Sequence, residues 1–233
     1  MISRINKKIV LVLGGTGNIG TAISSRLEDN GFVVCRHGSK GKYSADVRNW
    51  KETKVLLNKI LKEFGKIDVV VNSLSAPIKI NNIYDKNWNN YIEHFSVQLK
   101  AAVETAKYLV PMMIKNKYGH FINIISGVVV GSPPRGYADY ISAKYALLGF
   151  SKCFAEELNP KNIYISCVSP DFVSTRLTKI FPAKLGDILA SKNKSGRLTL
   201  PEDIAKAVLN LINKPKIGLE NIIISGGKIN NHE

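Results

Sequence analysis

Short apolar runs alternate along the chain with segments that are long enough for helices. The runs are KKIVLVLGG (7–15), GFVVCR (31–36), KIDVVVN (66–72), GHFINIIS (119–126), NIYISCVS (162–169) and ENIIISGG (220–227). Continuous Val and Ile runs are typical of strands that are covered by helices on both faces, and the alternation indicates a parallel sheet. We expect helices over 18–30, 50–64, 86–116, 137–159 and 202–213. The sequence therefore predicts an α/β fold with a doubly wound parallel sheet.

The length of 233 residues suits one domain that spans 1–233. Residues 178–200 show no clean period, and we interpret them as an inserted substrate loop or lid with short helical pieces. Only about ten residues separate the second apolar run from Asp46, which is too few for a crossover helix. We expect that helix to be missing.

The chain is basic, with 33 Lys and Arg against 18 Asp and Glu. Such an excess could indicate nucleic acid, an anionic membrane, or an acidic carrier or phosphorylated ligand. The basic residues are scattered, without a compact run that interleaves with aromatics, so a solvated Lys-rich surface is the simpler explanation and nucleic acid is not expected. The first apolar run is too short to cross a membrane and lacks a cleavage pattern. We expect a cytoplasmic protein without a membrane partner.

The cysteines and histidines show no ligand spacing. Without a C-x-x-C pair, the three cysteines are expected to be reduced and structural. They are Cys35, Cys153 and Cys167. The histidines are interpreted as ordinary surface or loop residues, and no metal is expected. They are His37, His94, His120 and His232.

The segment LVLGGTGNIG (11–20) places glycines where the first strand turns into the first helix. Gly14 permits a tight turn, and Gly17 lets backbone N–H groups approach a pyrophosphate. Gly20 allows the helix to pack on the strand. The spacing G-x-x-G-x-x-G differs from the usual dinucleotide fingerprint, and glycines also serve plain turns. The turn indicates a nucleotide site only in combination with other motifs.

A second motif lies in SGVVVGSPPRGYADYISAK (126–144), where Tyr140 precedes Lys144 by one helical turn. A nearby ammonium stabilises a phenolate, and a lowering of the phenol pKa by about three units needs roughly 4 kcal/mol. Tyr and Lys four residues apart also occur by chance on helices. Ser126 at a strand end, together with the glycine turn, makes the combination specific.

With these motifs the sequence resembles the short-chain dehydrogenase/reductase family over nearly its whole length. ADV at 45–47 resembles the family's Asp-Val pair, and VVVNSLSAP at 69–77 takes the place of its Asn-Asn-Ala-Gly segment. VSPDFVSTRL at 168–177 is similar to its Pro-Gly loop, and 197–212 and 222–227 resemble its closing helix and strand. The resemblance implies a Rossmann-like fold and a nicotinamide cofactor.

The resemblance also implies roles for residues of the site. Tyr140 would donate a proton to a carbonyl oxygen while the nicotinamide delivers hydride to its carbon. Lys144 would lower the Tyr140 pKa and bind the nicotinamide ribose, and Ser126 would orient the carbonyl. Family spacing puts Gln98 where an Asn usually completes the catalytic set, as a water-holding relay or as a residue that simply packs or solvates. The cofactor-binding residues would be Gly14, Thr16, Gly17, Asn18, Ile19, Gly20, Arg36, Ser39, Lys40, Asp46, Val47, Ser73, Leu74, Ser75, Tyr140, Lys144, Pro170, Val173 and Thr175.

The sequence departs from the family pattern at several positions. Asn18 takes the place of the middle glycine, and only Asn72 remains of the Asn-Asn-Ala-Gly segment. Asp171 stands where the Pro-Gly loop has glycine. After the second strand, no carboxylate is present to bind a ribose 2′-hydroxyl, and Arg36 and Lys40 are nearby. NADP is therefore expected rather than NAD.

The expected function is the NADPH-dependent reduction of a carbonyl, of ketone or 3-oxoacyl type, to an alcohol. The alternative is a cofactor-binding sensor or scaffold that has lost catalysis. An acyl carrier is a candidate substrate carrier, because Arg135, Arg176 and Lys179 would suit an acidic partner. A homodimer or homotetramer is expected from the resemblance.

Overall fold

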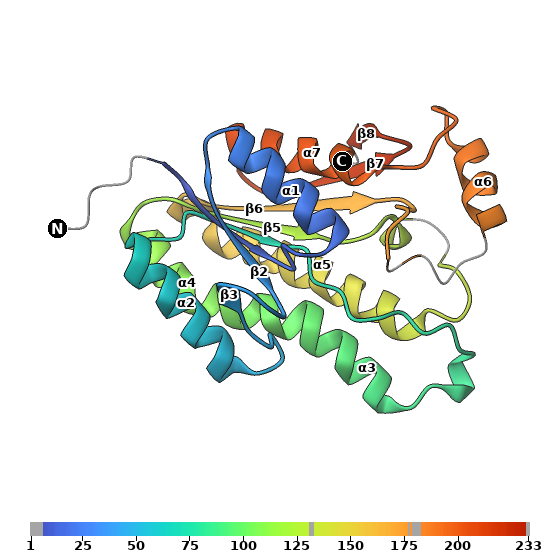
Figure 1. Ribbon diagram of the computed structural model, residues 1–233, viewed down its shortest axis with the longest axis horizontal. Helices are drawn as coiled ribbons and strands as arrows, with labels where there is room; N and C mark the ends of the chain where they lie inside the picture. The colour runs from blue at the N-terminus through green and yellow to red at the C-terminus, as the bar shows by residue number, and fades with distance from the viewer. Residues whose placement is uncertain (1–6, 131–132, 177, 179–182, 232–233) are drawn as a thin grey trace.

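The computed structural model describes residues 7–130, 133–176, 178 and 183–231 (Figure 1). Its centre is an eight-stranded sheet in the order β3-β2-β1-β4-β5-β6-β7-β8. All neighbours pair in parallel except β8, which is antiparallel to β7. The strands are β1 (Ile9–Leu13), β2 (Val33–Gly38), β3 (Tyr43–Ser44), β4 (Val69–Asn72), β5 (Gly119–Ile124), β6 (Ile163–Pro170), β7 (Leu219–Ser225) and β8 (Lys228–Asn231).

Helices cover both faces of the sheet (Figure 1). They are α1 (Asn18–Asp29), α2 (Trp50–Phe64), α3 (Trp88–His94), α4 (Ala101–Lys115), α5 (Ala138–Leu158), α6 (Ala183–Lys192) and α7 (Pro201–Asn213). One core layer packs α1 and α7 on the sheet, and the other packs α2, α4 and α5 on the opposite face. The central strands β1 and β4 are buried throughout. The doubly wound α/β fold is confirmed.

The structure departs from the expected elements in detail. β3 and β8 were not predicted, and the expected helix over 86–116 is divided into α3, a π-helical stretch from Phe95 to Lys100, and α4. In 178–200, where a loop with short helical pieces was expected, the helical piece is α6. Residues 177 and 179–182 lie outside the described residues, so the role of 178–200 as a lid stays a prediction.

The crossover from β2 to β3 contains only residues 39–42, and no helix, as expected. Side chains anchor this short connection on α2. The Tyr43 hydroxyl donates to Glu63 Oε2 at 2.9 Å, and Lys42 Nζ donates to Glu63 Oε1 at 2.6 Å. Lys59 Nζ donates to the Lys42 carbonyl at 2.7 Å. The edge strand β3 is thus held in place although no crossover helix connects it to β2.

The interpretation of the histidines as surface or loop residues is wrong for the three that the structure describes. His37, His94 and His120 are all buried. Each of them has a polar partner, as His120 Nε2 has in the Ser166 hydroxyl at 2.8 Å, and such pairing is what makes the burial of a polar ring possible. His232 lies outside the described residues. Within the part of the chain that the structure describes, no group of His, Cys, Asp and Glu could hold a metal ion.

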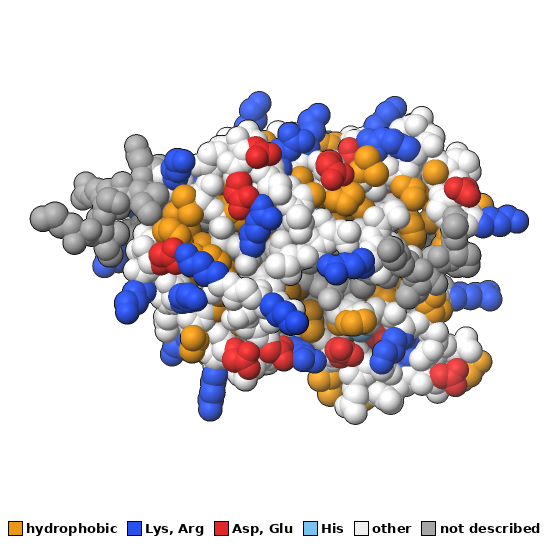
Figure 2. Space-filling view, in the orientation of Figure 1, with side chains coloured by type: hydrophobic (Ala, Val, Ile, Leu, Met, Phe, Trp, Pro, Cys, Tyr) orange, Lys and Arg blue, Asp and Glu red, His pale blue; other side chains and the backbone are white. Residues whose placement is uncertain are grey.

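The excess positive charge is distributed over the surface. On the face drawn in Figure 2, Lys and Arg side chains are scattered and interrupted by acidic groups. Several of them form exposed ion pairs, such as Lys216 with Glu220. This dispersal fits a solvated surface. No helix among the described residues has the length and apolar character needed to cross a membrane.

Candidate active site

The sequence motifs meet at the carboxyl edge of the sheet. The strand order reverses between β1, which continues to β2 and β3, and β4, which continues to β5 and β6. In doubly wound sheets, ligands bind at the carboxyl ends of the strands next to this switch point. The glycine-rich turn follows β1, Ser73 follows β4, Ser126 follows β5, and Asp171 follows β6. These segments therefore border one region.

The glycine-rich turn leaves no room for side chains at two positions. Gly14 has φ +75°, and a Cβ there would lie 2.8 Å from the Ser73 carbonyl oxygen. A Cβ at Gly20 would lie 2.1 Å from the Gly14 carbonyl oxygen. Gly17 caps α1 without a side-chain hydrogen bond, and the Thr21 N–H is paired with the Gly17 carbonyl at 2.8 Å. The N–H groups of Asn18, Ile19 and Gly20 precede this first helical hydrogen bond and so have no carbonyl partner within α1, and such a helix start suits a phosphate.

Asn18, which replaces a family glycine, connects this turn to the loop after β6. Its Oδ1 accepts the Arg176 N–H at 3.2 Å, and the Arg176 guanidinium donates to the Thr16 carbonyl at 3.4 Å. Within the same loop, the Thr178 hydroxyl donates to the Val173 carbonyl at 2.7 Å and accepts from the Thr175 N–H at 2.8 Å. Through Arg176, the segment after β6 therefore lies against the glycine-rich turn.

Ser126, Tyr140 and Lys144 form one cluster. Tyr140 and Lys144 are buried on α5, and the Ser126 hydroxyl lies close enough to the Tyr140 phenol to lower its pKa. Lys144 Nζ donates to the Ile124 carbonyl at the end of β5 at 2.8 Å, and it lies 5.8 Å from the Tyr140 ring centroid. The helical spacing and the strand end thus bring together the three residues that the sequence singled out.

The electrostatics of this cluster differ from the expectation. Burial raises the pKa of Tyr140, and the hydrogen bond with Ser126 opposes that rise only in part. Burial also lowers the pKa of Lys144 to about 7, although the Cys167 thiol opposes this. In this structure Lys144 therefore does not lower the Tyr140 pKa, because the ammonium itself is destabilised by burial. The phenol remains protonated at neutral pH, which is the state a proton donor needs.

The residues expected on the adenosine side are partly engaged elsewhere. Arg36 forms an ion pair with Glu28 of α1 and also donates to the Ser25 hydroxyl at 3.2 Å. The Asp46 carboxylate accepts from Arg48, which holds the pKa of Asp46 below its usual range. Ser39 and Lys40 are exposed, and Val47 is buried. Of these groups, Ser39 and Lys40 are the ones free to meet a 2′-phosphate.

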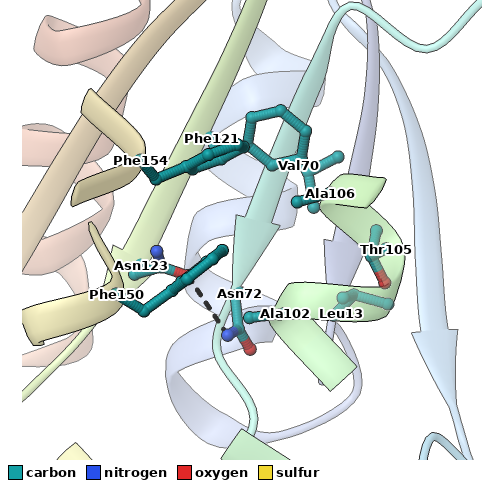
Figure 3. A pocket seen from close by; sticks show the side chains of 10 residues that line it. All are labelled: Leu13, Val70, Asn72, Ala102, Thr105, Ala106, Phe121, Asn123, Phe150 and Phe154. Carbon is teal, nitrogen blue, oxygen red and sulfur yellow. Dashed lines mark hydrogen bonds between the residues drawn. The ribbon is translucent and has the colours of Figure 1, made fainter. Parts of the chain in front are cut away.

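Asn72 has a structural role beneath the segment after β4. Its Nδ2 donates to Asn123 Oδ1 at 3.2 Å and to the Gln98 carbonyl at 3.3 Å, and its Oδ1 accepts from the Leu74 N–H at 3.3 Å. The Asn72–Asn123 pair borders a cavity of about 10 Å³ between the sheet and helices α4 and α5 (Figure 3). That space holds about one water molecule, so it is part of the core and not a substrate site.

Asp171 uses its side chain to join three segments. Its Oδ2 accepts from Asn193 Nδ2, the Ser225 hydroxyl and the Gly226 N–H, each at 3.1 Å. Its own N–H donates to the Ile224 carbonyl at 2.8 Å and so extends the pairing of β6 with β7 beyond Pro170. The Asp at this position thus fixes the region after α6 to the sheet, which a glycine would not do.

A buried charge cluster behind Tyr140 was missed in the sequence. Lys86 Nζ donates to Asp139 Oδ1 at 2.8 Å, and both side chains are almost fully buried. The His94 ring lies edge-on to the Tyr140 ring with centroids 5.9 Å apart, and His94 Nδ1 accepts from Gln98 Nε2 at 3.0 Å. Charged residues in a polar segment predict solvation, so no local signal could have placed Lys86 inside.

His37 was also missed. Its buried ring lies at the end of β2, where Nδ1 accepts the Gly14 N–H at 3.1 Å and Nε2 faces the Ala45 carbonyl at 3.0 Å. The available signal was its position directly after the apolar run over 31–36. A residue that continues a buried strand is expected to be buried as well.

Known reductases are similar to this chain over most of its length. A family model described as enoyl-(acyl carrier protein) reductase matches residues 18–227. The 3-oxoacyl-(acyl-carrier-protein) reductase of Haemophilus influenzae is 33% identical over 221 residues, which cover 86% of this chain and 88% of that protein. The protein of the same name from Thermotoga maritima is 28% identical over 229 residues, with 89% and 91% covered. The solved structure of ElxO with NADP bound has a TM-score of 0.85 at 25% identity, and the match covers 95% of this chain and 98% of that one.

Proposed function

The chain belongs to the short-chain dehydrogenase/reductase family of oxidoreductases, and on that premise we propose that it reduces a carbonyl group, of ketone or 3-oxoacyl type, to an alcohol with NADPH. The observation that carries this proposal is the cluster of Ser126 with the buried Tyr140 and Lys144 at the carboxyl edge of the sheet, the edge at which the glycine-rich turn also lies. The bare helix start fits a pyrophosphate. NADP is bound in the similar ElxO structure, which supports the choice of cofactor.

A bound nicotinamide cofactor supplies the hydride, and the residues of this chain supply position and protons. Tyr140 donates its phenolic proton to the carbonyl oxygen as negative charge develops there. Ser126, whose hydroxyl lowers the pKa of that phenol, orients the carbonyl and stabilises the developing charge. Lys144, held by the Ile124 carbonyl, would bind the ribose next to the nicotinamide and so fix the position of the cofactor. A cytoplasmic location would suit this chemistry, because NADPH is a soluble cofactor.

A 3-oxoacyl thioester is the substrate class that the relatives support, since two of them are named as reductases of 3-oxoacyl groups on an acyl carrier protein. Arg135 is exposed between β5 and α5, where an acidic carrier could meet it. Of the other two basic residues that would suit an acidic partner, Arg176 donates to the Thr16 carbonyl and Lys179 lies outside the described residues. NADPH consumption should therefore be faster with a 3-oxoacyl thioester than with simple ketones, quinones or pterins. Tight NADPH binding without turnover on any of these would instead favour a sensor or scaffold that has lost catalysis.

We expect NADPH to bind at least about tenfold more tightly than NADH, a difference of about 1.4 kcal/mol. The residues after β2 offer a hydroxyl and a cation at Ser39 and Lys40, and no carboxylate repels a 2′-phosphate. Fluorescence titration with both nucleotides measures the ratio. Lys40→Ala should reduce the ratio, whereas Lys115→Ala, which removes an exposed lysine at the end of α4, should not. Equal affinities, or tighter binding of NADH, would contradict the assignment.

Gln98→Ala should lower turnover by roughly ten- to a thousandfold with little change in cofactor affinity, as expected when proton transfer is impaired. Gln98 is fully buried in the π-helical stretch, so it does not simply face solvent. Its Oε1 has no hydrogen-bond partner among the described residues and is therefore free to hold a water. Gln98→Asn keeps the carboxamide and should retain more activity. If the alanine variant turned over normally with an intact circular dichroism spectrum, Gln98 would have only a packing role.

A further inference from the structure

The His37 ring connects three backbone segments at the edge of the proposed cofactor site. It is buried at the end of β2. Nδ1 accepts the Gly14 N–H at 3.1 Å, and Nε2 donates to the Ala45 carbonyl at 3.0 Å. A neutral imidazole can accept at one nitrogen only while it donates at the other, so the Ala45 bond fixes the tautomer that the Gly14 bond needs. The ring thus joins the glycine-rich turn, β2 and the segment after β3.

Gly14 helps to fix the shape of the turn through both its backbone N–H and its carbonyl. Gly14 has a positive φ, and a glycine loses more conformational freedom on folding than any other residue. Its carbonyl accepts the Gly17 N–H at 3.0 Å and packs tightly against Gly20. Gly17 caps the first turn of α1. Whatever holds the Gly14 N–H therefore also holds the start of α1, where the phosphate-binding N–H groups lie.

We propose that His37 is a positioning residue that holds the glycine-rich turn in its nucleotide-binding shape through the Gly14 N–H, an inference that rests on the proposed function. His37 needs no contact with the cofactor for this role. A protonated imidazole would turn a donor toward the Gly14 N–H and break the bond. Binding of the nucleotide should therefore weaken in acid as His37 becomes protonated.

The surroundings of His37 keep the ring neutral near pH 7. Burial lowers the pKa of His37 below its ordinary value, while the hydrogen bond to Ala45 and the charge of Asp46 oppose this. Asp46 faces the ring from the segment before α2, and its carboxylate is paired with Arg48. On the side of the glycine-rich turn, the neighbouring group is the uncharged Gly14 amide. Arg36, which is paired with Glu28, precedes His37 in β2, and its side chain therefore points to the face of the strand opposite the His37 ring.

Two substitutions of His37, each of which keeps one of the two hydrogen bonds of the ring, test these bonds separately. In His37→Asn, the amide oxygen takes the place of Nδ1, so it can accept from Gly14 and cannot be protonated in this pH range. In His37→Gln, the amide nitrogen takes the place of Nε2, so it can donate to Ala45 and leaves the Gly14 N–H without a partner. By calorimetric titration with NADP⁺ at pH 8, we expect a Kd within about threefold of the parent for Asn and at least about tenfold weaker for Gln.

Two further measurements test the mechanism. As the pH falls from 7 to 5, the Kd of the parent should rise more steeply than that of His37→Asn. Protonation of the nucleotide affects both proteins equally, so the difference between the two slopes reports His37. Without nucleotide, exchange of the Gly14 amide hydrogen should be at least about tenfold faster in His37→Gln than in the parent. His120→Asn serves as the control, since it removes a buried histidine from the start of β5, away from the carboxyl edge.

The outcomes distinguish this inference from the proposed function. If the parent binds no nicotinamide nucleotide, the proposed function fails, and the hydrogen-exchange measurement still tests the role of His37. If the parent binds NADP⁺ and His37→Gln binds it equally well, with unchanged Gly14 exchange, the positioning role is overturned. An equal loss of affinity in His120→Asn would also overturn it, because the effect would then come from lost stability in general.

Discussion

Tyr140→Phe should reduce carbonyl turnover at least about a thousandfold while the Kd for NADPH stays within about threefold of the parent. The substitution removes the phenolic hydroxyl that donates the proton and whose pKa Ser126 lowers. It keeps the buried ring and its edge-on contact with His94, so the fold should be retained. Steady-state NADPH consumption with a 3-oxoacyl thioester measures turnover, and fluorescence titration measures nucleotide binding.

The matched control is Tyr145→Phe, which removes a phenol from a half-exposed position on the same helix, one residue beyond Lys144. We expect it to turn over like the parent. A Tyr140→Phe enzyme within tenfold of the parent would mean that another group supplies the proton. A large loss of nucleotide affinity in that variant would mean that Tyr140 contributes mainly to cofactor binding.

The sequence predicted the parts of the molecule that depend on local pattern. Continuous apolar runs marked β1, β2, β4, β5, β6 and β7, and 50–64 corresponds to α2 without a shift of either end. Tyr140 and Lys144 were brought together by helical periodicity alone. By contrast, β3 has only two residues and exists because it pairs with β2 at His37 and Gly38. Such a strand depends on tertiary pairing, which leaves no period in the sequence.

The missed parts of the candidate site share one physical cause. His37 and the charged residues behind Tyr140 are buried because partners distant in the sequence satisfy them. Composition and spacing predict the charged groups to be solvated, since an unpaired charge rarely enters a core, and for His37 only its place after the second apolar run indicated burial. The engagement of Arg36 by Glu28 likewise depends on how β2 lies against α1. The sequence identified Arg36 as a residue that could bind a phosphate, but it did not show that Glu28 would pair with it.

The ion pair between Lys86 and Asp139 links the segment before α3 to the helix that carries Tyr140. Its side chains are only 1% and 2% exposed. Lys86 Nζ also donates to the Lys79 carbonyl at 2.9 Å, and Asp139 Oδ1 accepts the Tyr140 N–H at 2.9 Å. Breaking a buried pair by removing one partner leaves an uncompensated charge, which is far more costly than losing an exposed pair.

Lys86→Met should therefore lower the free energy of unfolding by about 3–5 kcal/mol, measured by urea denaturation at pH 7. Met is close in length to Lys and fills the same space, so the loss reports the missing charge and not a cavity. The control is Lys216→Met in an exposed i,i+4 pair with Glu220, for which we expect a change of at most about 1 kcal/mol.

The double variant Lys86→Met/Asp139→Asn separates the charge from the hydrogen bonds. The carboxamide introduced by Asp139→Asn would keep an oxygen for the Tyr140 N–H while it carries no charge, so the double variant should be more stable than Lys86→Met alone. If it is, the buried carboxylate left by Lys86→Met is the cause of the instability. Its turnover should also exceed that of the single variant, because the start of α5 again holds Tyr140 in place. A double variant as unstable as the sum of the two single changes would contradict this, and would mean that Lys86 and Asp139 act independently.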